Sequence, residues 1–184
     1  MATIYMVRHG KAAAGFAAHK DPGLDETGLA QEQVIAEYLS ERINTPIDLL
    51  SSPLNRAMET AQPLAQAWSA PVAIEPRVAE IPSPSDDLEA RAAWLGQAMQ
   101  GSWSELGPEL QHWRSELNRC LEALQNDTVI FSHFVAINAA VGLAKNDQRM
   151  RIFSPDNCSV TIFSNDQGSL ELLELGITAD THIN

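Results

Sequence analysis

The chain contains few cysteines and no apolar run long enough to cross a membrane. Cys120 and Cys158 are the only two cysteines among 184 residues, and neither belongs to a C-x-x-C pair or a ligand-like cluster. Their positions within apolar patterns predict buried thiols in a reducing compartment. The N-terminus has no basic region followed by an apolar signal core, so we infer no secretory targeting. We therefore expect a cytoplasmic protein that does not enter a membrane.

Basic residues are also scarce. The chain has 12 Lys and Arg residues and 24 Asp and Glu residues, which gives a net charge of −12. This balance argues against a nucleic-acid partner, because phosphate backbones require a basic face, and weakly against anionic membranes. Against this background the grouping of Arg8, His9 and Lys11 is informative. A cationic pocket in an acidic protein predicts a small anion as the ligand, so we expect a negatively charged substrate.

Several motifs of other catalytic classes are missing. Gly10-Lys11 lacks the preceding glycine of a P-loop, and no G-x-S-x-G nucleophile elbow occurs. No spacing of histidine, cysteine and carboxylate residues suggests a metal site. We therefore expect chemistry that needs neither a metal nor a cofactor.

The apolar segments predict a single α/β domain over residues 1–184. The first strand is a continuous apolar run typical of the centre of a parallel sheet, and it ends at Arg8-His9-Gly10. Further strands are expected at residues 47–51, 71–74, 128–131, 159–164 and 169–173. Residues 80–126 are expected to form a helical excursion that caps an edge of the sheet.

Three other helices are expected between the strands. Asp25 is placed to cap the first, whose buried face should carry Ala30, Val34, Ile35, Tyr38 and Leu39. Ser52-Pro53 is expected to open the second as its N-cap and first residue, which places Arg56 in the first turn. The third is an almost wholly apolar helix at 134–143, directly after Ser132-His133.

The chain thus delivers polar residues to one edge of the predicted sheet from three places. Arg8 and His9 end one strand, His133 ends another, and Arg56 opens the helix after a third. Ligands of such sheets bind beyond the carboxyl ends of the strands. Two arginines match phosphate oxygens in bidentate fashion, and a histidine can serve as nucleophile near neutral pH. This inventory predicts phosphoryl transfer through a covalent phosphohistidine.

These residues resemble the histidine phosphatase superfamily, also called phosphoglycerate mutase-like. The resemblance rests on Arg8-His9-Gly10, on the block 51–61 that contains Arg56, and on Ser132-His133, in that order over nearly the whole chain. It implies a three-layer α/β/α sandwich with a mostly parallel central sheet. It also implies that His9 attacks the phosphoryl group while Arg8, Arg56 and His133 surround it. Neutral His9 is required for attack, helped by the adjacent guanidinium, whereas His133 would be more useful charged.

The resemblance further implies a carboxylate that protonates the leaving oxygen. By its position after Arg77-Val78-Ala79, Glu80 matches the family's acid. Glu75, Asp86 and Glu89 are its rivals.

The sequence departs from the family pattern near the phosphate. Ala12 and Gly15 stand where a hydroxyl residue and an asparagine are usual, so Asn157 or backbone amides are expected to substitute. Phe134 replaces a glycine and should narrow the pocket or add an apolar wall. The chain also lacks the insertions that retain a bisphosphorylated intermediate, which favours hydrolysis.

The function we expect is therefore hydrolysis of a phosphomonoester. A protein phosphohistidine phosphatase, a phosphoglycerate mutase-type phosphotransferase and an inactive binding domain of the same fold are the alternatives. The expected partners are a small phosphorylated substrate or a phosphoprotein, and a homodimer is left open. The other histidines match no motif: His19, His112 and His182.

Overall fold

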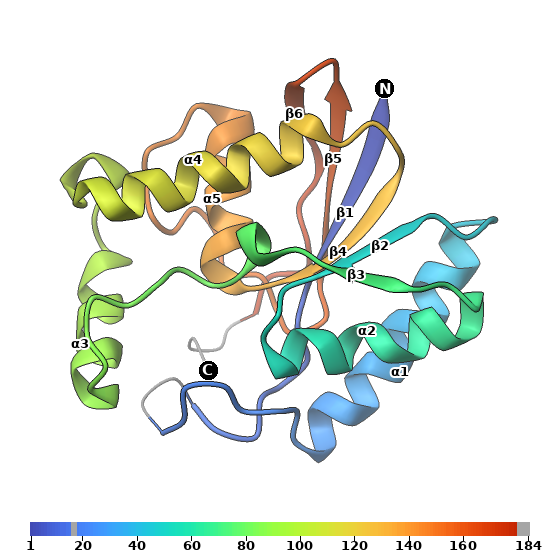
Figure 1. The fold of residues 1–184 in the computed structure, drawn as a ribbon, viewed down its shortest axis with the longest axis horizontal. Helices are drawn as coiled ribbons and strands as arrows, with labels where there is room; N and C mark the ends of the chain where they lie inside the picture. Colours follow the sequence, from blue (N-terminus) through green and yellow to red (C-terminus); the bar gives the residue numbers. More distant parts are fainter. Residues whose placement is uncertain (16–17, 180–184) are drawn as a thin grey trace.

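The computed structural model describes residues 1–15 and 18–179, which build a six-stranded sheet in the order β3-β2-β4-β1-β5-β6. The first four strands of this order are parallel, β5 runs antiparallel to β1, and β6 runs antiparallel to β5 (Figure 1). The strands are β1 (Ala2–Arg8), β2 (Asp48–Ser51), β3 (Val72–Ile74), β4 (Thr128–Ser132), β5 (Val160–Asp166) and β6 (Ser169–Glu174). β1 and β4 lie at the centre, where the sheet is covered on both faces.

Helices cover both faces and form the outer layers of a three-layer sandwich (Figure 1). α1 and α2 pack on one face, and α4 and α5 pack on the other. The helices are α1 (Glu26–Arg42), α2 (Asn55–Trp68), α3 (Leu88–Ala98), α4 (Pro108–Ala123) and α5 (Phe134–Lys145), with 3-10 turns η1 (Pro76–Val78) and η2 (Trp103–Glu105). The predicted mostly parallel α/β/α architecture is therefore confirmed.

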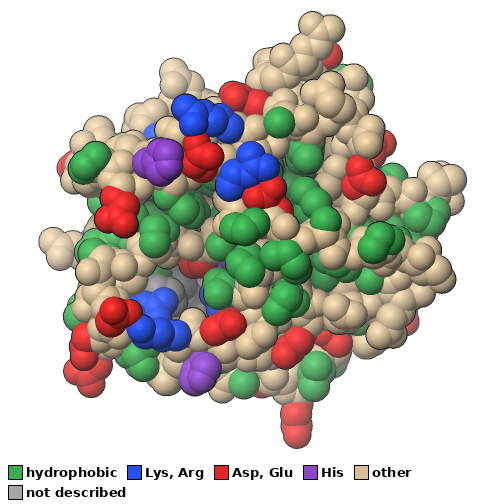
Figure 2. Space-filling model, viewed as in Figure 1, with side chains coloured by type: hydrophobic (Ala, Val, Ile, Leu, Met, Phe, Trp, Pro, Cys, Tyr) green, Lys and Arg blue, Asp and Glu red, His purple; other side chains and the backbone are tan. Residues whose placement is uncertain are grey.

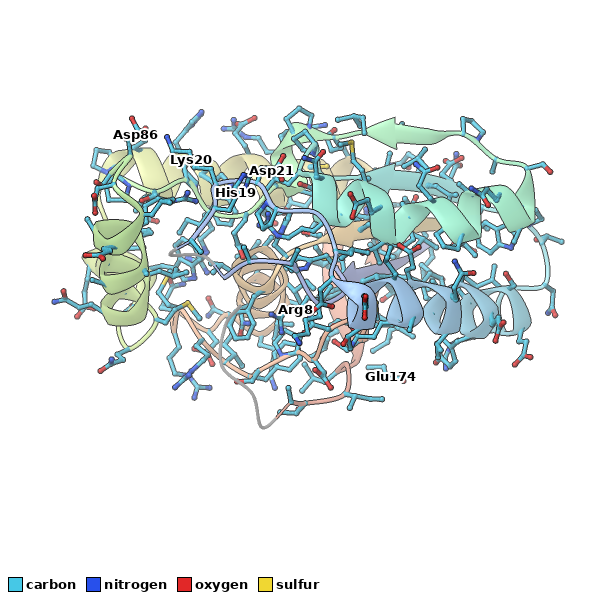
Figure 3. All side chains as sticks on the ribbon, turned by 90° about the horizontal axis from the view of Figure 1, so that it is seen from below. Arg8, His19, Lys20, Asp21, Asp86 and Glu174 are labelled. Carbon is cyan, nitrogen blue, oxygen red and sulfur yellow. The ribbon has the colours of Figure 1, made fainter. Side chains whose placement is uncertain are left out.

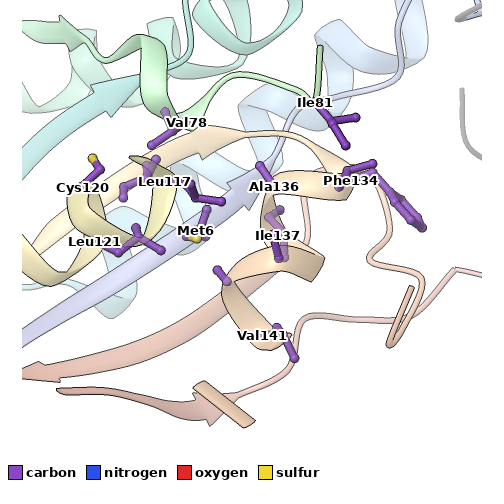
Figure 4. Close-up of a cluster of buried hydrophobic side chains, with 14 of the residues drawn as sticks. Met6, Val78, Ile81, Leu117, Cys120, Leu121, Phe134, Ala136, Ile137 and Val141 are labelled. Atoms are coloured by element: carbon purple, nitrogen blue, oxygen red, sulfur yellow. The ribbon is translucent and has the colours of Figure 1, made fainter. Parts of the chain in front are cut away.

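Alternation along the central strands divides the core into two layers. Ile4 and Met6 face α4 and α5, whereas Val7 faces α1 and α2. Figure 4 shows Met6 beside Leu117 and Leu121 of α4, with α5 alongside. Successive side chains of a strand point to opposite faces, so one apolar run supplies both layers.

The expectation that the excursion at 80–126 caps a sheet edge is wrong. Its longest helix, α4, lies over a face of the sheet, and its Leu117, Cys120 and Leu121 side chains are buried there. A stripe of large apolar residues is covered far more completely by a sheet face than by an edge strand.

The start of the second helix also differs from the prediction. α2 begins at Asn55, after Leu54 as an N-cap residue without a side-chain cap, rather than at Ser52-Pro53. The Ser52 hydroxyl does accept a bond from Leu54 N, at 3.2 Å, but within the turn that leaves β2. Its other partner lies across the sheet edge, as described below.

The buried face of α1 is rotated from the one predicted. Ile35 and Leu39 are buried as expected, but Val34 is 66% exposed and Tyr38 is 40% exposed. Gly28 turns the helix this way, because its backbone lies so close to the chain that a Cβ there would be 2.3 Å from Lys11 O. Contact with the loop after His9, rather than apolar content alone, therefore sets the helix face.

Of the two thiols predicted to be buried, one is buried and the other only partly. Cys120 is buried and Cys158 is half-buried, and both are free. Within residues 1–15 and 18–179, no helix has the length and apolar character that a membrane crossing requires.

Candidate active site

The register of β1 against β4 brings the two motif histidines together. Arg8 pairs with Ser132, so His9 and His133 follow at the same edge of the sheet. His9 N donates to Ser132 O at 3.1 Å. The two imidazole rings lie 5.1 Å apart, centroid to centroid, with an interplanar angle of 56°. Both side chains are buried, with at most 2% of their surface exposed.

The hydrogen bonds of His9 define which ring nitrogen carries its proton. Nδ1 lies 2.7 Å from Gly10 O, and a carbonyl oxygen can only accept, so the proton of the neutral ring is on Nδ1. Nε2 therefore presents its lone pair, which accepts a hydrogen bond from Arg56 Nε at 3.1 Å. Gly10 is itself held by Thr60, whose hydroxyl accepts from Gly10 N at 3.0 Å. The nitrogen that faces Arg56 therefore carries the lone pair that attack by an imidazole would require.

Two guanidinium groups and one imidazole bring unpaired nitrogens to the same place. Arg8 is 1% exposed, and its Nη1 donates a hydrogen bond to Pro155 O at 2.8 Å. Among the described residues, Arg8 Nε and Nη2, Arg56 Nη1 and His133 Nδ1 are buried without a hydrogen-bond partner. The nearest carboxylate to Arg56 is that of Asp21, 3.7 Å from Nη1. Unpaired buried donors are costly, and such a cluster has the chemistry of an anion site.

His133 is anchored by a residue that the sequence reasoning assigned elsewhere. Its Nε2 lies 2.7 Å from the hydroxyl oxygen of Ser52, and both side chains are fully buried. A serine that directly follows a strand at the same sheet edge was the available signal. From the sequence alone, Ser52 is expected only to cap a helix.

Glu80 follows η1, and its carboxylate lies at the N-terminus of α5 beside this cluster. Its carboxylate accepts from Ile81 N at 3.0 Å and from Val135 N at 3.2 Å. The charges of Arg8 and Arg56 both act on it.

The rival carboxylates are engaged elsewhere. Glu75 is bound by Arg77, at 2.6 Å, and Glu89 is exposed on α3. Asp86 is exposed and pairs with Lys20, which reaches it from the loop that also carries His19 and Asp21 (Figure 3).

Burial and charge shift the pKa values of the site in two directions. Burial is the main cause that lowers the pKa of His9 well below its usual value, and Arg56 and then Arg8 add to this. The pKa of His133 is lowered by burial and by Arg56. Burial raises the pKa of Glu80, against the backbone N–H of Ile81. These directions favour a neutral ring at both positions, which agrees with the expectation for His9 and disagrees with the expectation of a charged His133.

Asn157 and Phe134 each contact a residue of the cluster. Asn157 Nδ2 donates to His9 O at 2.9 Å, so the amide expected to bind phosphate holds the backbone of His9. Phe134 is buried beneath the guanidinium of Arg8, 5.2 Å from Cζ to the ring centroid. Cation–π contact of this kind orients an arginine.

Ala12 and His112 are not part of this cluster. Ala12 is buried and bridges to Leu24, and His112 is exposed on α4. His182 lies outside the described residues.

Comparison with known families agrees with this geometry. The model of the histidine phosphatase superfamily (branch 1) matches residues 4–178. The chain belongs to this superfamily. Its matched region contains the whole cluster of Arg8, His9, Arg56, Glu80 and His133.

Curated relatives of this chain include probable phosphoglycerate mutases. The one from Erwinia tasmaniensis is 27% identical over 191 residues, which cover 91% of this chain and 86% of the relative. The one from Yersinia pestis strain Pestoides F is 28% identical over 188 residues, which cover 88% and 84%.

Solved structures share the fold at lower identity. Phosphoserine phosphatase from Entamoeba histolytica aligns with a TM-score of 0.75 and 18% identity, covering 97% of this chain and 98% of its own. A mycobacterial glucosyl-3-phosphoglycerate phosphatase aligns with a TM-score of 0.73 and 22% identity, covering 94% and 96%. The predicted phosphoglycerate mutase-like fold is thereby confirmed.

Proposed function

We propose that this histidine phosphatase hydrolyses a phosphomonoester through a covalent phosphohistidine on His9. One observation carries the proposal. His9 Nε2 presents a lone pair within a buried group of unpaired donors on Arg8, Arg56 and His133. Such a group fits the negative oxygens of a phosphoryl group, which is where phosphoryl transfer needs stabilisation.

The first step forms the bond between Nε2 and phosphorus and breaks the bond between phosphorus and the leaving oxygen. Glu80, whose pKa is raised, donates its proton to that oxygen as it leaves. Arg8, Arg56 and His133 donate hydrogen bonds to the three remaining oxygens. The phosphorylated ring carries positive charge, and the proton on Nδ1 keeps its bond to Gly10 O.

The second step is hydrolysis of the intermediate. The Glu80 carboxylate takes a proton from water, the oxygen of which bonds to phosphorus while the bond to Nε2 breaks. Inorganic phosphate leaves, and both Glu80 and His9 return to their starting protonation states. Glu80 is the residue whose proton count changes, because His9 keeps its Nδ1 proton throughout, and the cycle as written uses neither a metal nor a cofactor.

The substrate is expected to be a small anionic phosphomonoester. The relatives are named for phosphoglycerate, phosphoserine and glucosyl-3-phosphoglycerate, all of which carry a phosphate near a carboxylate. Figure 2 shows acidic side chains spread over one face and basic side chains only in small groups, which does not favour nucleic acid on that face. Phosphoserine and 3-phosphoglycerate therefore open the substrate panel.

Trapping the intermediate tests the proposal. The enzyme is mixed with a phosphomonoester carrying radioactive phosphate and is denatured at alkaline pH, where phosphohistidine survives. We expect label on the peptide that contains His9, none in His9→Ala, and normal labelling in His112→Ala, which removes an exposed histidine of α4. An unlabelled wild-type chain would identify a binding domain and refute the proposal.

Product analysis separates the catalytic alternatives. Release of inorganic phosphate is expected from the small esters. An isomerised phosphoglycerate would indicate a mutase, and turnover confined to phosphohistidine peptides would indicate a protein phosphatase.

A further inference from the structure

Ser52 is built into the site more firmly than a turn residue requires. It is fully buried between β2 and α2, and its backbone N donates to Phe131 O of β4 at 3.0 Å. That bond ties Ser52 to the strand that delivers His133. The hydroxyl oxygen then lies 2.7 Å from His133 Nε2. The pair is therefore fixed from both sides by backbone.

The hydrogen bonds at Ser52 decide where the proton of His133 sits. The serine hydroxyl has one hydrogen to give, and its oxygen already accepts from Leu54 N at 3.2 Å. If His133 Nε2 carried the proton, it would donate to the same oxygen. The serine hydrogen would then be buried without an acceptor among the described residues.

With the proton on Nδ1 instead, every polar group at the contact between Ser52 and His133 has a hydrogen-bond partner. Ser52 donates its hydrogen to Nε2, accepts from Leu54 N, and leaves the proton of the neutral ring on Nδ1. Nδ1 is the buried His133 atom without a protein partner. Since burial and the charge of Arg56 lower the pKa of His133, this tautomer is the state in which the ring can offer a hydrogen.

We infer that Ser52 is a positioning residue that holds neutral His133 in the Nδ1–H tautomer, so that Nδ1 donates to a phosphoryl oxygen. The inference rests on the proposed function, because that function supplies the oxygen. It assigns His133 the role of a neutral donor rather than a cation. Ser52 acts only through His133 and does not touch the reacting atoms.

The tautomer can be read directly by NMR. In protein labelled with heavy-nitrogen histidine, long-range nitrogen–proton correlations distinguish Nδ1–H from Nε2–H rings, and His133→Asn assigns the signal. We expect Nδ1–H in the wild type and a shift towards Nε2–H in Ser52→Ala. An Nε2–H ring in the wild type overturns the inference without any variant at Ser52.

Kinetics test whether the tautomer matters. Ser52→Ala should lower kcat by about tenfold with KM little changed, the size of one lost hydrogen bond in the transition state. Ser51→Ala is the matched control, because Ser51 is equally buried and its hydroxyl donates only to Ser52 O, at 2.9 Å. It should leave kcat close to the wild-type value.

A double variant shows whether Ser52 acts through His133. In a His133→Asn background, Ser52→Ala should cause no further loss, whereas an undiminished tenfold loss there overturns the inference. The labelled His9 peptide separates this result from the proposed function. If wild-type His9 is labelled but Ser52→Ala changes neither tautomer nor kcat, only the inference about Ser52 fails.

Discussion

Two buried neutral histidines should make the stability of this protein fall on mild acidification. The pKa values of His9 and His133 lie well below 6.5 in the folded chain, whereas the unfolded chain takes up protons near pH 6.5. Below that pH the unfolded state binds more protons, so the free energy of unfolding falls as pH falls. The stabilisation from each neutral ring is present above pH 6.5 and is lost below it.

The size of the effect follows from linkage. Between about pH 7.5 and about pH 5.5, a histidine that stays neutral in the folded state and titrates in the unfolded state lowers the free energy of unfolding by about 1.4 kcal/mol. His9→Asn removes one such group, so the variant should lose about 1.4 kcal/mol less than the wild type over this range. The double variant with His133→Asn should lose about 2.7 kcal/mol less, within the limits of non-additivity for two rings in contact.

Urea unfolding at the two pH values measures these differences, with linear extrapolation at each. His112→Asn is the control, since it removes an exposed histidine of the same protein. Comparison of losses rather than absolute stabilities cancels the packing cost of each substitution. Equal acid losses in His9→Asn and the wild type would show that the folded state protonates His9 readily, which would refute the lone-pair assignment.

Three further predictions concern the acid, the close backbone approach and metal independence. Glu80→Gln should slow turnover of alkyl phosphates far more than turnover of nitrophenyl phosphate, and equal losses on both substrates would point to another acid. For alkyl phosphates, the variant should also lose the fall in kcat/KM that the wild type shows as pH rises through the raised pKa of Glu80. Gly28→Ala should lower the free energy of unfolding by about 1 to 3 kcal/mol, because the added Cβ would meet Lys11 O. Gly96 on α3 has open space around it, so Gly96→Ala should be neutral or stabilising by up to about 1 kcal/mol in the same denaturation assay. A chelator should leave steady-state kcat unchanged, and a loss of kcat would contradict a cycle in which Glu80 alone moves the proton.

The meeting of Arg8, His9 and His133 could be predicted from sequence because it depends on local patterns. Each apolar strand ends abruptly in polar residues, and parallel strands place those ends at one edge. The structure realises this through the pairing of Arg8 with Ser132. Arg56 followed from the same reasoning, since the helix after a parallel strand begins at that edge.

Other features depend on contacts that no local pattern carries. The face of α1 is set by the approach of Gly28 to the loop after His9, which joins segments of independent sequence. Asn157 was placed near the phosphate because it lies near a strand start, but its amide reaches His9 O. Strand ends can thus be located from periodicity, whereas the atom that each polar group contacts depends on the folded chain.

The charge state of His133 shows why an electrostatic prediction needs geometry. From residue types alone, a cationic ring beside a phosphate is attractive, and two arginines nearby look like partners in the same task. In the fold, the ring is fully buried and shares that space with Arg8 and Arg56, so a third positive charge is opposed by desolvation and repulsion together. In the proposed mechanism the arginines already supply the charge that balances the phosphoryl oxygens. A neutral ring that gives one well-aimed hydrogen adds to their effect without competing with them, which is the arrangement that a serine at position 52 enforces.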